Sequence, residues 1–249
     1  MQVIPPLHTE RGSGRYFYLW HLGIPLVGAL ILLLLEMTQI DGLVSSWFYD
    51  AATERFPLHY NATFEIVTHH WAKYLVVLVG FAVVASYAMS FVISALRDRR
   101  RLLLFLSLAL TLAPAAVSLL KAGSLKHCPY DLVEYGGYAV HLSLFDAPVP
   151  GQRPGHCFPS GHASAGFCLL AFYFAGLALG SRRLALCGLW GGLATGMLFG
   201  MARVAQGAHF VSHNLWSALV CWLVILALYI VIMGPPKTTP ATAAVTNTG

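Results

Sequence analysis

The stretch that decides the fold is LLLFLSLALTLAPAAVSLL, residues 102–120. It contains no charged residue, and its length is close to the roughly 20 apolar residues that an α-helix needs to cross a bilayer. The basic run RDRRR, residues 97–101, precedes it, and Lys121 follows it directly. This pattern predicts a helix that spans a membrane and carries basic residues at both interfaces.

Further apolar segments of similar length lie on either side. The six segments are Tyr16–Thr38, Tyr74–Leu96, Leu102–Leu120, Ala163–Gly180, Leu184–Met201 and Leu215–Met233. Of the 249 residues, 57% are hydrophobic and 10% are charged, whereas soluble domains carry about 25% charged residues. We therefore predict an all-α polytopic membrane protein with six transmembrane helices in one domain, residues 1–234. A disordered cytoplasmic tail rich in proline and threonine would follow, residues 235–249.

The distribution of charge predicts the orientation of these helices. The net charge of +5 does not indicate nucleic-acid binding, because the basic residues are sparse and lie at the ends of apolar segments. Short loops contain RDRRR and SRR (residues 181–183), which favours both termini in the cytoplasm. The short loops and the small size of the chain suggest a bacterial inner membrane. The first segment is longer than a signal-peptide core and lacks a clear cleavage site, so we interpret it as retained.

Two long loops, residues 39–73 and 121–162, would then lie on the outer, periplasmic side. The first loop contains the aromatic run Trp47, Phe48 and Tyr49. This run suits a segment that lies at the membrane interface. A loop that packs on the helix ends explains it equally well.

The second outer loop ends in PSGHASAG, residues 159–166. Pro159 ends any preceding helix, Gly161 allows a close backbone approach, and the small residues that follow can begin a helix. A helix N-terminus presents unpaired N–H groups that bind phosphate. Ser160 adds a hydroxyl donor, and His162 in the first turn would donate a proton to a leaving oxygen. An ordinary helix cap is the alternative interpretation.

Two more clusters lie on the same predicted side. In ARVAQGAHFVSHNLW, residues 202–216, Arg203 precedes His209 by six positions. A guanidinium group fits phosphate oxygens in a two-pronged way, and an imidazole can attack phosphorus, although an arginine here can also anchor the helix at the interface. In KAGSLKHCPYDL, residues 121–132, Lys121 and Lys126 supply cationic donors and Pro129 ends the local helix.

These clusters, in this order, resemble the type 2 phosphatidic acid phosphatase (PAP2) superfamily, whose pattern is KxxxxxxRP, PSGH and SRxxxxxHxxxD. The resemblance covers Lys121–His213 and implies a six-span membrane architecture. It implies that His209 is the nucleophile and forms a phosphohistidine, and that His162 protonates the leaving group. It further implies no metal or other cofactor and a set of phosphate-binding residues: Lys121, Ser160, the Gly161 backbone and Arg203.

Three positions depart from the family pattern. Cys128 stands where the first motif has arginine, Ala202 where the third has serine, and His213 where the third has aspartate. Candidates to replace the missing cation are Lys126, His127 and Arg153. A neutral His213 can still accept a hydrogen bond from His209 and fix its tautomer, although it offers no negative charge. Alternatively, another carboxylate, Asp131 or Asp146, orients His209.

The cysteines divide into two groups. Cys128 and Cys157 lie in the outer loop, whereas Cys168, Cys187 and Cys221 lie within predicted spans. An oxidising periplasm favours a disulfide between the first two, which would join the first motif to the second. The alternative is a free thiol at Cys128 in the place of the arginine.

The resemblance implies a metal-independent phosphatase that acts on a lipid phosphate or diphosphate at the outer leaflet. Plausible substrates are undecaprenyl diphosphate, phosphatidylglycerol phosphate, phosphatidic acid and lipid A 1-phosphate. The expected partners are this lipid substrate and the membrane lipids. Three alternatives remain open: a lipid-to-lipid phosphotransferase, a non-catalytic lipid-phosphate binder, and a zinc hydrolase. The last is raised by the four-residue spacing of His209 and His213, which lack the glutamate of H-E-x-x-H.

Overall fold

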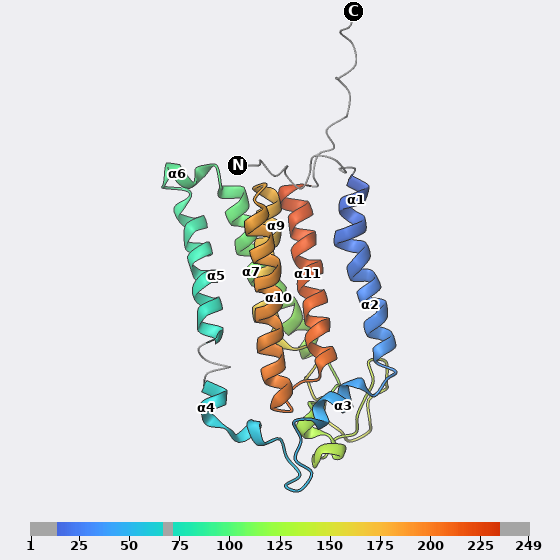
Figure 1. Cartoon of the computed structure of the whole chain (residues 1–249). Coiled ribbons are helices and arrows are strands. Elements are labelled where there is room, and N and C mark those ends of the chain that lie inside the picture. Colours follow the sequence, from blue (N-terminus) through green and yellow to red (C-terminus); the bar gives the residue numbers. More distant parts are fainter. Residues whose placement is uncertain (1–13, 67–71, 235–249) are drawn as a thin grey trace, which may run out of the picture.

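The structure, a computed structural model, describes residues 14–66 and 72–234 (Figure 1). All regular elements in these residues are helices, so the prediction of an all-α fold is confirmed. The β contacts within the same residues are limited to two isolated bridges. The predicted tail, residues 235–249, lies outside the described residues.

Five helical stretches among the described residues are long and apolar enough to cross a membrane. They are Tyr16–Leu35, Arg100–Ala122, Gly161–Ala178, Arg182–Ala205 and Val211–Met233. The first consists of α1 (Gly14–Tyr18), a π-helical turn (Leu19–Gly23) and α2 (Ile24–Leu35). The third consists of α8 (Gly161–Phe167), a 3-10 turn (Cys168–Leu170) and α9 (Ala171–Ala178). The other three are single helices: α7 (Arg100–Ala122), α10 (Arg182–Ala205) and α11 (Val211–Met233).

The remaining predicted segment, Tyr74–Leu96, forms a shorter helix. Helix α5 (Ala72–Met89) has an apolar part, Tyr74–Met89, that falls below the length of the five stretches. Turns follow at residues 90–92, and the extended backbone of Ile93 separates α5 from α6 (Ser94–Arg97). By length and composition the structure therefore supports five of the six predicted transmembrane helices.

The arginine-rich turns and the predicted site residues lie at opposite ends of the helical bundle (Figure 1). One end holds α6 and the first residues of α7 and α10, together with the beginning of α1 and the end of α11. The other end holds α3 (Ile40–Ser46), α4 (Ala62–Glu65) and the long connection between α7 and α8. This connection contains two 3-10 turns, Pro129–Asp131 and Val133–Tyr135.

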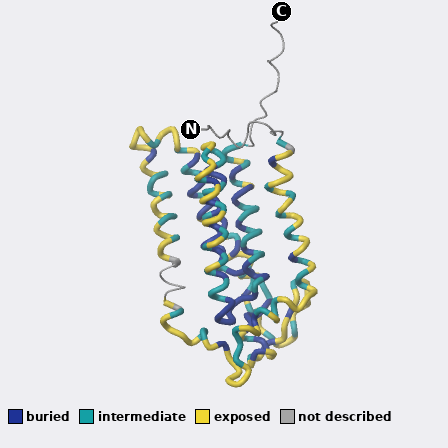
Figure 2. The backbone as a smooth tube through the Cα atoms, viewed as in Figure 1, coloured by how far each residue is buried: buried dark blue, intermediate teal, exposed yellow. Residues whose placement is uncertain are grey.

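The hydrophobic core lies among α7, α8–α9 and α11, and α10 packs against it. Fully buried members of this core include Phe105, Phe167, Phe174 and Ile225. Exposed residues predominate instead along α1–α2 and α5 (Figure 2). Many of these exposed side chains are large and apolar, such as Phe81, which is 70% exposed. Apolar surface of this extent is typical of contact with lipid.

A row of glycines brings α10 against α8 and α9. The row recurs at every fourth residue and is buried throughout: Gly188, Gly192, Gly196 and Gly200. A Cβ atom on Gly196 would stand 2.2 Å from the ring of Phe167 in α8. Small residues at this spacing let the backbones of membrane helices approach closely. The row therefore sets the separation between the helix that carries Arg203 and the helix that carries His162.

The described part of the first long loop, residues 39–66, packs on the connection between α7 and α8. Phe56, Tyr135 and Phe210 are buried together, and Phe48 and Tyr49 pack against their cluster. Of the two predicted roles for the aromatic run, Phe48 and Tyr49 thus fit packing on the helix ends. Trp47 is 77% exposed and remains available to a membrane interface.

Candidate functional site

His209 lies in the short connection between α10 and α11. Gly207, with a φ of +67°, ends α10. The N–H of Gly207 donates to the carbonyl of Val204, and the N–H of Ala208 donates to the carbonyl of Arg203. This pair of bonds is a Schellman motif, in which a left-handed glycine satisfies the last carbonyls of a helix. The turn places His209, which is 2% exposed, between the ends of two helices.

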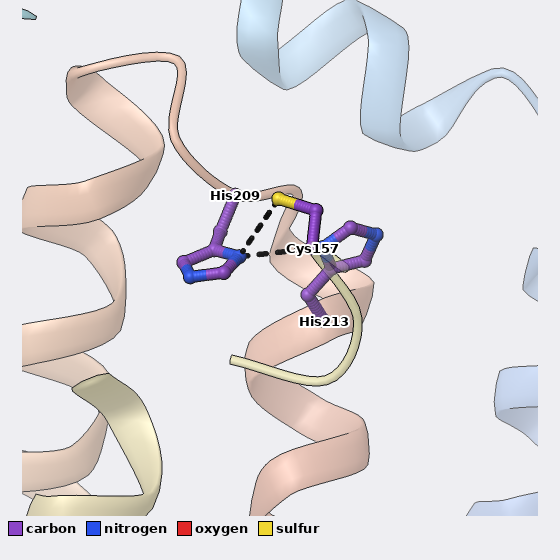
Figure 3. A group of neighbouring side chains, drawn as sticks. All are labelled: Cys157, His209 and His213. Carbon is purple, nitrogen blue, oxygen red and sulfur yellow. Dashed lines mark hydrogen bonds between the residues drawn. The ribbon is translucent and has the colours of Figure 1, made fainter. Parts of the chain in front are cut away.

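Two further side chains converge on His209 (Figure 3). Its Nδ1 atom lies 3.5 Å from the Nδ1 atom of His213 and 3.5 Å from the Sγ atom of Cys157. His213 belongs to the first turn of α11, Cys157 to the loop before α8, and both are fully buried. The structure thus brings the predicted nucleophile into contact with the histidine that replaces the aspartate of the motif.

The PSGH turn forms the beginning of α8. Ser160 is the N-cap residue, and its Oγ atom accepts from the N–H of Ala163 at 3.4 Å. The N–H of Ser160 donates to the carbonyl of His213, and its carbonyl accepts from Oγ of Ser217. These bonds fix the turn against the first two turns of α11. A Cβ atom on Gly161 would meet nothing within 4 Å, which leaves room for a ligand at the N-terminus of α8.

His162 lies in the first turn of α8, opposite His209. The two ring centroids are 6.3 Å apart, and the ring planes are inclined by 54°. His162 is partly exposed, whereas His209 is buried. A phosphorus atom between the rings would have an attacking nitrogen on one side and a proton donor on the other. Phosphoryl transfer with roughly in-line geometry requires this arrangement.

Lys121 and Arg203 supply positive charge beside His209. Arg203 lies in the last turn of α10, where its Nη1 atom donates to Oε1 of Gln206 at 2.8 Å. Lys121 lies in the last turn of α7 and is partly buried. The charges of both residues act on His209 and on each other. The ends of α7, α8 and α10 therefore converge on one imidazole.

The pKa of His209 is held well below its ordinary value of 6.5. Burial is the main cause, and the charges of His213, Lys121, His162 and Arg203 lower the pKa further. At neutral pH the ring is consequently uncharged and keeps a lone pair on one nitrogen. A histidine nucleophile needs this protonation state.

Cys128 and Cys157 form a disulfide between residues 29 positions apart, with their Cα atoms at 5.2 Å. The bond joins the first motif to the second directly beside His209. In this structure Cys128 is therefore not the free thiol of the alternative interpretation.

Of the three residues considered as replacements for the missing arginine, Lys126 and His127 are engaged elsewhere. Lys126 forms a largely buried ion pair with Glu36. The Nε2 atom of His127 lies 2.9 Å from the carbonyl oxygen of Arg153, whose own side chain is exposed. The cationic side chains that act directly on His209 are thus Lys121 and Arg203.

The two aspartates considered as partners of His209 have other surroundings. A carboxylate oxygen of Asp146 accepts from the N–H of Ser143 at 2.7 Å. Asp131 lies in the Pro129–Asp131 turn, where its carboxyl group interacts with His127 and His59. The contact that the structure gives to Nδ1 of His209 is therefore with His213 and with the sulfur of Cys157.

Cys157, His209 and His213 also have the donor types of a metal site. One ligand atom from each residue lies within 4.8 Å of the others. Thiolates bind metals, and Cys157 cannot become a thiolate while it is bonded to Cys128. The oxidised protein therefore offers two adjacent histidines at this position rather than three metal ligands.

Two residues that the sequence analysis missed complete the site. Gln206 is 1% exposed, holds Arg203 and donates to the carbonyl of Leu58 in the first outer loop. Asp41 of α3 accepts from the N–H of Ser212 in the first turn of α11 at 2.9 Å. This carboxylate satisfies a helix N–H and complements the helix dipole. Neither role has a local sequence signal, because both depend on contacts with a distant loop.

Comparison with known families identifies a match. The model of the PAP2 superfamily matches residues 102–235, which is more than half of the chain. The match begins near the start of α7 and includes Lys121, His162, Arg203, His209 and His213. The chain has no match among the curated proteins or the solved structures with which it was compared.

Proposed function

The chain belongs to the PAP2 superfamily, and on this premise we propose that it is a membrane phosphatase that cleaves phosphate from a lipid phosphate or diphosphate. The observation that carries the proposal is the environment of His209, a buried neutral imidazole that faces His162 and is flanked by two cations. Positioning and fixed positive charge are the main means by which proteins accelerate phosphoryl transfer.

In the first proposed step, the Nε2 lone pair of His209 attacks phosphorus while the bond from phosphorus to the leaving oxygen breaks. His162 gives its proton to that oxygen. Lys121, Arg203 and the N–H groups at the beginning of α8 hold the other phosphoryl oxygens. The imidazole ring becomes positively charged, and its Nδ1–H donates to His213.

In the second step, His162 takes a proton from water, and the resulting hydroxide attacks the phosphohistidine. The bond between phosphorus and nitrogen breaks, inorganic phosphate leaves, and His209 regains its lone pair. If the hydroxyl or phosphate group of a second lipid replaces the water, the same residues transfer the phosphate to that lipid.

An apolar groove supports a lipid as the substrate. The groove has a volume of about 660 Å³ and lies between α1–α2 and the bundle of α9–α11. Ile31, Leu35, Leu170 and Leu215 are among its lining residues. Leu215 follows His213 by two positions, so the groove extends along α11 to the level of the site.

We also propose that the site faces the periplasm of a bacterial inner membrane and that α5 is the sixth transmembrane helix. The arginines at 97–101 and 182–183 lie at the end of the bundle opposite to the site. Arginines in short loops favour the cytoplasmic side. Both termini would then lie in the cytoplasm.

The test is phosphate release by the purified full-length protein in detergent. The panel contains undecaprenyl diphosphate, phosphatidylglycerol phosphate, phosphatidic acid and lipid A 1-phosphate. We expect turnover of at least one of these, and a loss of about 100-fold or more in His209→Ala and in His162→Ala. Thermal unfolding of each variant checks that it is folded.

Three other results would redirect the proposal. Activity of His209→Ala near that of the wild type would exclude His209 as the nucleophile. Binding of a lipid phosphate by the wild type without release of phosphate would indicate a non-catalytic binder. Labelled phosphate that appears on an added acceptor lipid, rather than in solution, would indicate a phosphotransferase.

A further inference from the structure

We propose that reduction of the Cys128–Cys157 disulfide creates a metal site from Cys157, His209 and His213, which takes a divalent ion of the zinc type. The three residues come from the loop before α8, the connection before α11 and the first turn of α11 (Figure 3). The claim that an ion at this site stops catalysis rests on the proposed function. The claim that the site exists does not rest on the proposed function.

The two separations that involve His209 fit such an ion, and the three ligand atoms all lie within 4.8 Å of one another. Tetrahedral zinc, with bonds of about 2.3 Å to sulfur and about 2.0–2.1 Å to nitrogen, separates neighbouring ligand atoms by about 3.3–3.6 Å. The Nδ1 atom of His209 lies 3.5 Å from Nδ1 of His213 and 3.5 Å from Sγ of Cys157. The fourth position of the tetrahedron would be open to water, as in sites with three protein ligands.

Reduction supplies the ligand that the oxidised protein lacks. A dithiol reductant donates two electrons and two protons to the Cys128–Cys157 bond, becomes a disulfide itself and leaves two protein thiols. Binding of the ion then displaces the proton from Sγ of Cys157, since the thiolate is the form that coordinates metals. Cys128 provides no ligand atom to the cluster. The role of Cys128 is to hold Cys157 in the disulfide.

Because of the surrounding positive charges, binding of the ion depends on this thiolate. Lys121 and Arg203 place positive charge around His209 and oppose a divalent cation. A thiolate offsets one of the two charges of the ion, whereas two neutral imidazoles offset none. The site is therefore expected to bind the ion in the reduced protein and to leave it unbound in the oxidised protein.

An ion at this site removes the nucleophile. A neutral imidazole has one lone pair and one proton on its two ring nitrogens. Coordination through Nδ1 of His209 uses the lone pair of that atom and so places the proton on Nε2. This is the nitrogen that attacks phosphorus in the proposed mechanism. The metal-bound protein is thus inactive until the ion is removed.

A matched pair of variants separates the metal ligand from the disulfide. Cys128→Ser and Cys157→Ser both lack the bond, but only Cys128→Ser keeps the sulfur next to His209. Both carry Cys187→Ser in addition, which removes the exposed free thiol. The full-length proteins, free of polyhistidine tags, are titrated with Co²⁺ in detergent. The wild type is titrated untreated and after reduction by a phosphine, which is oxidised to the phosphine oxide with oxygen from water.

Cobalt bound to a thiolate shows a charge-transfer band in the near ultraviolet, which histidine ligands alone do not produce. We expect this band in Cys128→Ser and in the reduced wild type, and its absence in Cys157→Ser and in the oxidised wild type. Equal spectra for the two variants would overturn the proposal. So would the absence of the band from both Cys128→Ser and the reduced wild type.

Activity provides the second measurement. Zinc at about ten times its dissociation constant should leave about one-tenth of the phosphatase activity of Cys128→Ser, and a chelator should restore the rest. Zinc should not inhibit the oxidised wild type in this way. If no variant or wild type has activity, the proposed function fails and the cobalt band still decides the metal site. If the band is absent and activity is present, the metal site alone is wrong.

Discussion

The Nδ1 atoms of His209 and His213 face each other at 3.5 Å, and a hydrogen bond between them needs one proton. If Nε2 of His209 attacks phosphorus, the proton belongs to Nδ1 of His209, and His213 is the acceptor. The proton of His213 then lies on its Nε2 atom. That atom is buried and has no hydrogen-bond partner within residues 14–66 and 72–234. His213 thus fixes the tautomer of the nucleophile while one buried donor stays unsatisfied.

His213→Asp is therefore expected to raise turnover. A carboxylate accepts the same proton, adds the negative charge that stabilises the phosphorylated ring, and leaves no orphaned donor. His213→Ala should lower turnover by about 10–100-fold, by analogy with the partners of metal-bound histidines. His213→Asn keeps an acceptor without the charge and serves as the control, near the wild-type rate. The measurement is kcat on the best lipid phosphate. A wild-type rate in His213→Ala would show that His213 does not assist His209.

The lowered pKa of His209 predicts that acid destabilises the fold. In the unfolded chain this histidine binds a proton below about pH 6.5, whereas the folded protein keeps it neutral to a lower pH. The unfolded state thus holds more protons in this window, so the free energy of unfolding decreases as the pH falls below 6.5. The slope that His209 contributes is at most about 1.4 kcal/mol per pH unit.

Denaturant unfolding of the wild type and of His209→Asn, from about pH 7 to about pH 5, measures this slope. The variant should lose stability less steeply, because asparagine does not titrate. Identical slopes would mean that His209 titrates in the folded protein as it does in the unfolded chain.

Gly196→Ala should destabilise the bundle. The added methyl group would stand 2.2 Å from Phe167, so α8 and α10 would have to move apart. Overpacking of this kind costs about 1–3 kcal/mol. Gly191→Ala is the matched control on the same helix, since its Cβ atom would meet nothing within 4 Å. The thermal midpoint in detergent compares the two, and an equal shift for both would contradict the close approach of α8 and α10.

Reporters of sidedness test the proposed orientation. A reporter fused after Gly249 or inserted at Arg99 should report the cytoplasm, and one within residues 136–155 should report the periplasm. A further reporter at Ala52 should lie on the periplasmic side, because α5 separates Ala52 from Arg99. The same side for Ala52 and Arg99 would remove α5 as a transmembrane helix.

The helices and the motifs could be predicted because their signals are local. The apolar segments Leu102–Leu120 and Leu184–Met201 lie inside α7 and α10, and each helix continues by a few residues into its flanking polar positions. The predicted segment Tyr74–Leu96 extends beyond α5, because Phe91 and Ile93 continue the apolar pattern after the helix has ended. Hydropathy indicates whether a side chain prefers an apolar environment, and it does not indicate whether the backbone is helical.

The contacts that complete the site could not be predicted, because they join distant elements. Asp41 and Gln206 have no motif that marks them, and their partners lie in other loops. The glycines of α10 are visible in the sequence, but their spacing of four residues gains meaning only when Phe167 is known to face Gly196. Tertiary packing supplies this information.

Asp41 is synthesised long before Ser212, the hydrogen-bond partner that follows it by 171 positions. Helix α11 is the last helix of the described chain, and its first turn carries His213. Contacts between distant parts of a chain form late, since the chain between them must be ordered first. The loop that contains Asp41 therefore reaches its final packing only after α11 has been synthesised. A chain interrupted before α11 would lack His213 and the hydrogen bond that joins Ser212 to Asp41.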